Sequence, residues 1–255
     1  MEFSILIFIL GSMIGSFLNM LIYRLPLQIS LINPKRSICP NCGNQIKWSE
    51  NIPILSYLFL KGKCSNCKEP ISSSYFFVEV LSGGVFVALF LKFGLDTTFV
   101  LYSLLFSLLI LLSFIDLKYK AVPDYLLLMA LFLSFFLPNF VFGDALMFAG
   151  GFVLLDFVVT FYIQNIKSRI TNNEELQNQK ALGEGDIPIV AIIGGALGLK
   201  LGLFAIIVAA ITAIFPALYG QMKHKEIETP FIPYLFLGLF FVLLFGESIY
   251  MIDVN

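Results

Sequence analysis

The stretch FVLYSLLFSLLILLSFIDLKYK, residues 99–120, decides the class of fold to which this chain belongs. It is an almost uninterrupted run of apolar residues that ends in Asp116 and two lysines. A run of about 20 apolar residues is what an α-helix needs to cross the hydrocarbon core of a bilayer. We therefore predict a membrane-spanning helix over residues 98–115, with the charged residues at one membrane surface.

The same pattern recurs along the chain. The other predicted spans are residues 3–23, 74–93, 123–142, 144–163, 187–199, 201–219 and 231–250. Hydrophobic residues make up 58% of the 255, which exceeds the apolar share of ordinary soluble domains. The sequence therefore predicts an all-α polytopic membrane protein with about eight transmembrane helices. A net charge of −1 argues against a nucleic-acid partner, because nucleic-acid-binding domains present a basic face.

The basic residues predict how the spans are oriented. Fourteen of the 16 Lys and Arg residues follow the first, third, fifth or seventh span, and only Lys92 and Lys200 fall on the other side. Short loops rich in Lys and Arg stay in the cytoplasm. We therefore expect those four loops to be cytoplasmic and both termini to lie outside. Because no basic residue precedes the first apolar run, we interpret that run as a retained helix rather than a secretory signal.

One polar insert separates the first two spans. It contains all four cysteines of the chain, as Cys39-x-x-Cys42 and Cys64-x-x-Cys67. Two such pairs, about twenty residues apart, are typical of a four-cysteine zinc site. The insert has few apolar residues for a core, so metal binding would supply stability. Disulfides are disfavoured in the cytoplasm, although a redox or disulfide role for the cysteines remains the alternative. Four thiolates would close the coordination sphere and make the zinc structural.

The insert divides the chain into three predicted parts. These are a first transmembrane helix (residues 1–23), a cytoplasmic zinc-binding domain (24–73) and a membrane domain (74–255).

Ionisable groups in membrane spans are candidates for function. Four acids qualify: Glu79, Asp116, Asp156 and Asp186. The predicted topology places Asp116 and Asp186 at the same cytoplasmic depth, as a pair of catalytic carboxylates requires. One ionised carboxylate would take a proton from water while the other, protonated, polarises the scissile carbonyl. Each aspartate alone also has a structural interpretation, Asp186 as a helix cap and Asp116 as an interfacial acid balanced by neighbouring lysines.

Other polar residues receive simpler interpretations. Gly183 and Gly185, just before Asp186, would allow unusual backbone angles and the close approach of an extended substrate. Asp124 follows Pro123 and is interpreted as the N-cap of the fourth span. Glu79 and Asp156 are expected to pair with polar groups of neighbouring helices, and the small residues of GSFLN (15–19) to mediate helix packing.

Taken together, these motifs resemble the bacterial type IV prepilin peptidases. The resemblance rests on GSFLNMLIYRLP from Gly15, the paired CxxC insert, YFFVEVLSG, DLKYKAVPD from Asp116, GEGD ending at Asp186 and PFIPYLFLG from Pro230. It implies that Asp116 and Asp186 are the catalytic pair of a GxGD aspartic protease of the bacterial inner membrane. Substrates would be type IV prepilin or pseudopilin precursors, cleaved after a glycine at the cytoplasmic face.

The resemblance also implies a second activity. The freed N-terminal residue would be methylated from S-adenosylmethionine, although no glycine-rich motif for that cofactor is legible. One departure concerns Pro188, which stands where family members commonly carry Lys and puts substrate preference in doubt.

Two other classes of protein remain open on the sequence. A proton-coupled transporter could use Asp116, Asp156 and Asp186 as a proton path, with helices broken at Gly194 and Gly195. The four-cysteine domain could instead be a binding module on a membrane anchor.

Overall fold

The computed structural model describes residues 2–32, 37–39, 41–171, 183–222 and 230–252. Within these ranges the chain is helical, without extended strands, which confirms the predicted all-α class. The chain forms two compact units, Met1–Ala121 and Val122–Asn255. Five of the basic residues used to orient the spans lie outside the described ranges: Lys35, Arg36, Lys180, Lys223 and Lys225.

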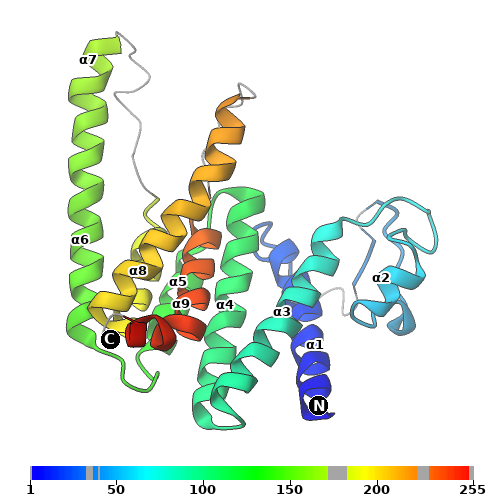
Figure 1. The fold of residues 1–255 in the computed structure, drawn as a ribbon. Helices are drawn as coiled ribbons and strands as arrows, with labels where there is room; N and C mark the ends of the chain where they lie inside the picture. The colour runs from blue at the N-terminus through cyan, green and yellow to red at the C-terminus, as the bar shows by residue number, and fades with distance from the viewer. Residues whose placement is uncertain (1, 33–36, 40, 172–182, 223–229, 253–255) are drawn as a thin grey trace. The chain divides into compact units, whose positions relative to one another are not determined.

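The first unit is built on three long helices, α1 (Glu2–Arg24), α3 (Ser73–Phe93) and α4 (Thr97–Tyr119). Helices α1 and α3 lie side by side, and α4 packs against both (Figure 1). Small residues allow the closest approach: a Cβ added at Gly15 would lie 2.8 Å from the Glu79 Cα, and one at Gly11 would lie 2.8 Å from the Ser82 carbonyl oxygen. Close packing through glycines is usual between membrane helices and confirms the packing role predicted for residues 15–19.

The polar insert between α1 and α3 has little regular structure in its described residues, which exclude 33–36 and 40. It contains the short 3₁₀-helix η1 (Trp48–Glu50), the short helix α2 (Leu55–Phe59) and two isolated β-bridges. Hydrogen bonds tie its ends to the helices. The buried Arg24 guanidinium, at the end of α1, donates from Nη1 to the carbonyls of Ser30 and Leu31 at 3.0 and 3.2 Å.

The second unit contains the remaining helices. They are α5 (Asp124–Ser134), α6 (Phe142–Phe161), the π-helix η2 (Tyr162–Lys167), α7 (Ser168–Thr171), α8 (Asp186–Met222) and α9 (Ile232–Ile252). Helix α8 is central, because α5, α6 and α9 each pack against it (Figure 1). Helices α5, α6 and α9 therefore pack around α8, which begins at Asp186.

Helix α8 is interrupted at Gly198, whose φ of 74° and ψ of 178° are not helical. The break falls at the predicted boundary between the sixth and seventh spans, and not at Gly194 and Gly195, where a transporter-like interruption is expected. Those two glycines instead contact aromatic rings: a Cβ at Gly194 would lie 2.6 Å from Phe148, and one at Gly195 would collide with Phe140. Their role in the structure is therefore close packing.

The fourth predicted span differs most from its expected length. Helix α5 ends at Ser134, whereas the sequence predicts a span that reaches residue 142. Pro138 and the left-handed backbone of Asn139 (φ 61°) lie in the predicted remainder, and a proline interrupts helical hydrogen bonding. An 11-residue helix is about 17 Å long, which is shorter than the hydrocarbon core of a bilayer.

Among the described residues, five helices are long and apolar enough to cross a membrane. They comprise α1, α3, α4, the continuous helix of residues 142–170, and α8. Helices α5 and α9 are apolar but shorter over their described parts. The predicted multi-pass architecture is thus confirmed in outline.

Candidate functional site

The two CxxC segments fold into nearly identical loops. In the first, the Cys39 N–H bonds to the Asn44 carbonyl at 2.9 Å, and the Gly43 N–H bonds back to the Cys39 carbonyl at 2.9 Å. The second loop repeats both bonds 25 residues later, from Cys64 to Glu69 at 2.9 Å and from Lys68 to Cys64 at 3.1 Å. Isolated bridges close both loops, Ile38 with Gln45 and Lys63 with Pro70.

Both loops turn through a left-handed residue after the second cysteine. Gly43 has a φ of 68° and Lys68 a φ of 62°. Glycine adopts this conformation without strain, whereas a residue with a side chain does so at a cost. Both residues therefore act as turn residues that close their loops.

The loops bring all four thiols together. The sulfurs of Cys39, Cys42, Cys64 and Cys67 all lie within 4.8 Å of one another and could hold a metal ion. The Cys39 and Cys67 sulfurs are 3.9 Å apart. A tetrahedral ion with metal–sulfur bonds of about 2.3 Å needs sulfurs about 3.8 Å apart, so the spacing fits. The Asn66 amide lies 3.7 Å from the Cys42 sulfur, as a hydrogen bond to a ligand from outside the coordination sphere would.

The electrostatics of the cluster favour a cation. The Asn44 backbone N–H and the Asn66 amide lower the pKa of the Cys42 thiol to about 7. The Glu69 N–H also favours the Cys67 thiolate, but burial and the other three sulfurs outweigh that bond and raise the pKa of Cys67 to about 12. Thiolates crowded this closely repel one another. A bound metal ion removes that repulsion, which is why the donor set suits a metal.

The first predicted catalytic aspartate lies in the last turn of α4. Asp116 is 8% exposed, and its carbonyl accepts the Lys120 N–H that closes the helix, at 2.9 Å. The ammonium of Lys118 lies over the rings of Tyr23 and Tyr119, 5.4 and 5.0 Å from their centroids. Asp116 is thus a buried acid at a helix end, rather than a surface acid in water.

The second predicted aspartate begins α8. Asp186 is 5% exposed, and its N–H bonds to the Gly183 carbonyl at 3.0 Å. A Cβ at Gly183 would lie 3.2 Å from the Asp186 Oδ2, and one at Gly185 would lie 3.4 Å from a methyl group of Leu127. Neither glycine has a φ between +20° and +160°, so neither uses the left-handed backbone that glycine allows. At Gly183, the absent side chain leaves room beside the carboxylate. Pro188 lies in the first turn of α8, where proline is tolerated.

One other acid, Asp124, differs from its prediction. Asp124 is the first residue of α5 and Pro123 its N-cap, so the interpretation of Asp124 as the N-cap is wrong, because the helix begins one residue earlier than that interpretation requires. Asp156 of α6 accepts a hydrogen bond from Thr160 of the same helix at 3.3 Å. Asp116 belongs to the first compact unit and Asp186 to the second.

Glu79 links the helices to the polar insert. It is 8% exposed on α3, and its Oε2 accepts the Ile54 backbone N–H at 2.7 Å. Ser16 and Asn19 of α1 form further side-chain hydrogen bonds with its carboxylate, which confirms the pairing with a neighbouring helix. Asn19 also donates to the Tyr75 carbonyl at 2.9 Å. Together these bonds fix the insert against α1 and α3.

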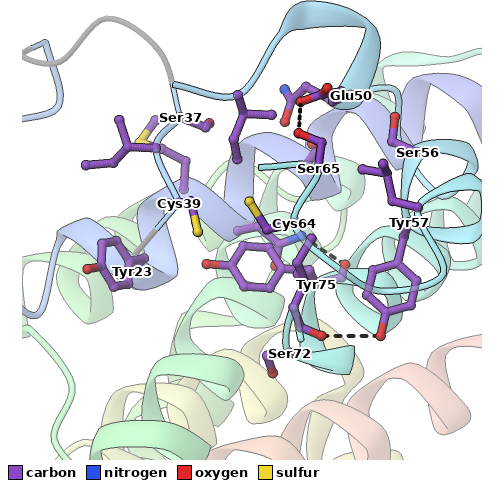
Figure 2. A pocket seen from close by; sticks show the side chains of 18 of the residues that line it. Tyr23, Ser37, Cys39, Glu50, Ser56, Tyr57, Cys64, Ser65, Ser72 and Tyr75 are labelled. Atoms are coloured by element: carbon purple, nitrogen blue, oxygen red, sulfur yellow. Dashed lines mark hydrogen bonds between the residues drawn. The ribbon is translucent and has the colours of Figure 1, made fainter. Parts of the chain in front are cut away.

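A cavity of about 500 Å³ lies at this junction, within the first unit. Its wall combines residues of α1, the two cysteine loops, the start of α3 and Lys118 (Figure 2). Its polar residues, among them Glu50, Tyr57 and Tyr75, could not be identified from the sequence, because they come from segments that only the fold brings together. The available signal was Glu79, an acid inside a predicted span that needs polar partners.

Comparison with known proteins gives two adjoining family matches. Residues 9–93 match the bacterial peptidase A24 N-terminal domain. Residues 103–218 match the type IV leader peptidase family. No solved structure matches the chain.

Several curated proteins named prepilin leader peptidase/N-methyltransferase are similar to this chain over most of its length. The protein of Vibrio cholerae is 32% identical over 239 residues, covering 87% of this chain and 88% of its own. That of Bacillus subtilis is 32% identical over 253 residues, or 96% and 95%. That of Myxococcus xanthus is 40% identical over 200 residues, which cover 76% of this chain but only 56% of the relative.

Proposed function

Because the chain belongs to the type IV leader peptidase family, we propose that it cleaves the basic leader from type IV prepilins or pseudopilins. Cleavage follows a glycine at the cytoplasmic face of a bacterial inner membrane, and the new N-terminal residue is then methylated. The names of the relatives support both activities. Neither the family match nor these names support the alternative of a proton-coupled transporter.

Asp116 and Asp186 are the proposed catalytic residues. The observation that carries this assignment is that both are buried acids at helix ends, one closing α4 and one opening α8. One carboxylate, ionised, takes a proton from the attacking water, and the other, protonated, donates a hydrogen bond to the scissile carbonyl. Gly183 and Gly185 are proposed to lie beside the substrate backbone, and the space next to the Asp186 carboxylate supports this for Gly183.

The four cysteines are proposed to bind a structural zinc ion. Their spacing and their crowded thiols support this assignment. Zinc would be fully coordinated by four thiolates, so it would stabilise the insert and leave no open position for substrate. S-adenosylmethionine would supply the methyl group for the second activity.

The eight predicted spans are retained as part of the proposal. Helix α8 would count as two segments that meet at Gly198, because a straight helix of 33 residues is about 50 Å long and exceeds the hydrocarbon core. Helices α5 and α9 would add one segment each. Both termini would then lie outside, and the four-cysteine domain, residues 24–73, would be cytoplasmic, next to the membrane domain of residues 74–255.

The proposal is tested with purified protein and a prepilin substrate that carries its leader. Asp116→Asn and Asp186→Asn should each lower the rate of leader release by at least about a hundredfold, because acid–base groups contribute on this scale. Asp96→Asn serves as the matched control, since Asp96 lies at the opposite end of α4 and is exposed. Cleavage near the wild-type rate in either of the first two variants would refute the catalytic pair.

A further inference from the structure

Helix α2 carries an exposed apolar face. Leu55, Leu58 and Phe59 are 51%, 57% and 82% exposed. Their spacing of three and four residues places them on one side of the helix, while Ser56 is buried and Tyr57 packs against an aromatic ring of α3. None of the three lines the cavity at the junction with α1 and α3. This side of α2, here called the α2 face, is therefore an outer surface, of the kind that contacts a membrane or another protein.

Two contacts fix the depth of α2 beside α3 (Figure 1). The rings of Tyr57 and Phe76 have their centroids 5.5 Å apart, and the Ile54 N–H bonds to the Glu79 carboxylate. Helix α3 begins at Ser73, so Phe76 and Glu79 lie about 4.5 and 9 Å along its axis. With 21 residues, α3 is about 32 Å long and only just crosses a hydrocarbon core of about 30 Å. Helix α2 is therefore held where headgroups meet acyl chains, the depth of about 5–10 Å at which interfacial helices lie.

Two lysines follow α2 at a level nearer to water. Lys61 and Lys63 are exposed and flank Gly62, whose carbonyl accepts the Ile71 N–H at 2.7 Å. Ile71 precedes the start of α3, so the backbone of both lysines lies outside the apolar stretch of that helix. The Tyr57 hydroxyl joins the two levels, because it donates to the Ile71 carbonyl at 3.4 Å (Figure 2). Apolar side chains thus lie at the deeper level and ammonium groups at the outer one, the arrangement of an interfacial helix.

The apolar surface of α2 adjoins that of α3. Phe77 is 59% exposed on α3, and its ring centroid lies 5.9 Å from that of Phe76, the partner of Tyr57. Trp48 is exposed on η1, which contacts α2. Tryptophan and tyrosine are enriched where a membrane meets water. Because α3 is itself long and apolar enough to cross a bilayer, one lipid surface can cover both helices, which favours lipid over a partner protein.

We propose that the α2 face, with Lys61 and Lys63, binds the phospholipid surface at which α3 enters the bilayer. Residues 47–63 carry three lysines and one glutamate, a net charge of +2, so anionic headgroups are favoured. The apolar side chains enter the boundary of the acyl chains, and the ammonium groups contact lipid phosphates. The insert is then an interfacial domain that lies on the membrane, rather than one held in water by its two flanking helices.

The single tryptophan of the chain makes this depth measurable. Trp48→Phe combined with Phe59→Trp moves the only indole onto the α2 face, and the exchange of aromatic side chains at an exposed position leaves the packing of α2 unchanged. Trp48→Phe combined with Phe77→Trp is the matched reference on α3. Both full-length proteins are placed in nanodiscs of phosphatidylcholine and phosphatidylglycerol, with zinc content and leader cleavage as checks of folding.

Two quenchers of tryptophan emission then distinguish lipid from water. Bromine on the acyl chains quenches from within the bilayer, and acrylamide quenches from water. The indole at position 59 should lose emission to brominated lipid as the reference at position 77 does, and should resist acrylamide. Strong quenching by acrylamide alone would place the α2 face in water, and resistance to both quenchers would show that protein covers it. Either result would overturn the inference.

The lysines are tested in the same protein. Lys61→Gln together with Lys63→Gln should increase quenching by acrylamide in nanodiscs that contain phosphatidylglycerol, but not in nanodiscs of phosphatidylcholine alone, because only the anionic surface attracts ammonium groups. Lys92→Gln is the control, since Lys92 lies in the last turn of α3, and it should change neither. Equal effects in the two lipid mixtures, or in the control, would overturn the assignment to anionic headgroups.

Hydrogen exchange of the wild-type protein gives a readout that needs no variant. The amides of residues 47–63 should exchange more slowly in nanodiscs with phosphatidylglycerol than in those with phosphatidylcholine alone, whereas residues 83–93 should exchange equally in both. Equal exchange of residues 47–63 in the two mixtures would also overturn the preference for anionic lipid.

Discussion

Gly15 provides a sharp test of how α1 and α3 are held together. In Gly15→Ala the new Cβ would lie 2.8 Å from the Glu79 Cα and 3.0 Å from the Ser82 Cβ. Ordinary contacts between carbon atoms are about 3.5–4.0 Å long. The Glu79 atom belongs to the backbone and cannot rotate away, so the two helices would have to separate by roughly 1 Å.

The cost can be estimated from two opposing effects. Overpacking of this kind costs about 1–3 kcal/mol, and replacing a helical glycine by alanine returns about 1 kcal/mol. We therefore expect Gly15→Ala to lower the free energy of unfolding by up to about 2 kcal/mol. Gly84→Ala is the matched control, because nothing lies within 4 Å of its added Cβ. It should raise the free energy of unfolding by up to about 1 kcal/mol.

Unfolding in mixed micelles with a rising fraction of denaturing detergent would measure both variants side by side. The decisive result is the sign: the same chemical change should destabilise the protein at Gly15 and stabilise it at Gly84. Shifts of equal size in the same direction would show that the close approach of α1 and α3 does not determine stability, and would refute the reasoning.

Three further predictions concern the four-cysteine domain. Lys68→Gly should slow the loss of zinc to a chelator, because relief of the left-handed backbone at φ 62° is worth about 1 kcal/mol. Lys63→Gly is the control, because Lys63 has no positive φ, and it should not slow the loss. Equal effects of the two substitutions would contradict this prediction. Brief chelation should leave prepilin cleavage largely intact if, as proposed, two carboxylates activate the water. Cleavage that disappears and returns only with zinc would indicate a metalloprotease or an obligatory structural coupling. Cys64→Ser should lower the zinc content, since three ligands hold zinc less tightly than four. It should also impair methylation more than cleavage when both are measured on one prepilin substrate. Equal collapse of both activities in a correctly inserted protein would show that the four-cysteine insert and the membrane domain act as one unit.

Features that depend on local chemistry were predictable from the sequence. The CxxC spacing predicts a cluster of four thiols, and the long apolar runs predict the long helices, because both follow from neighbouring residues. The end of α5 at Ser134 was missed, since hydropathy continues past the point where Pro138 and Asn139 change the backbone. The sequence could not distinguish a break at Gly198 from one at Gly194 or Gly195, because all three are glycines and only the structure shows which one departs from helical angles.

The cavity was beyond prediction for a different reason. Glu79 and Ile54 are 25 residues apart, and their hydrogen bond depends on how the insert folds back onto α3. The periodicity of hydrophobic residues in the sequence does not predict such a contact. The acid in the span signals that a partner exists, but only the fold identifies that partner as a backbone N–H.

The paired cysteine loops also give a metal ion a mechanical role. Cys39 and Cys67 are 28 residues apart, and an ion that joins them turns the intervening chain into a closed ring. Closing a ring of this size removes about 3–4 kcal/mol of chain entropy from the unfolded state, by analogy with a covalent cross-link. Ile54 lies inside this ring and Glu79 outside it. Losing the ion would loosen the insert that connects α1 to α3, so the supply of the metal would control how firmly the segment that carries Ile54 is held against α3.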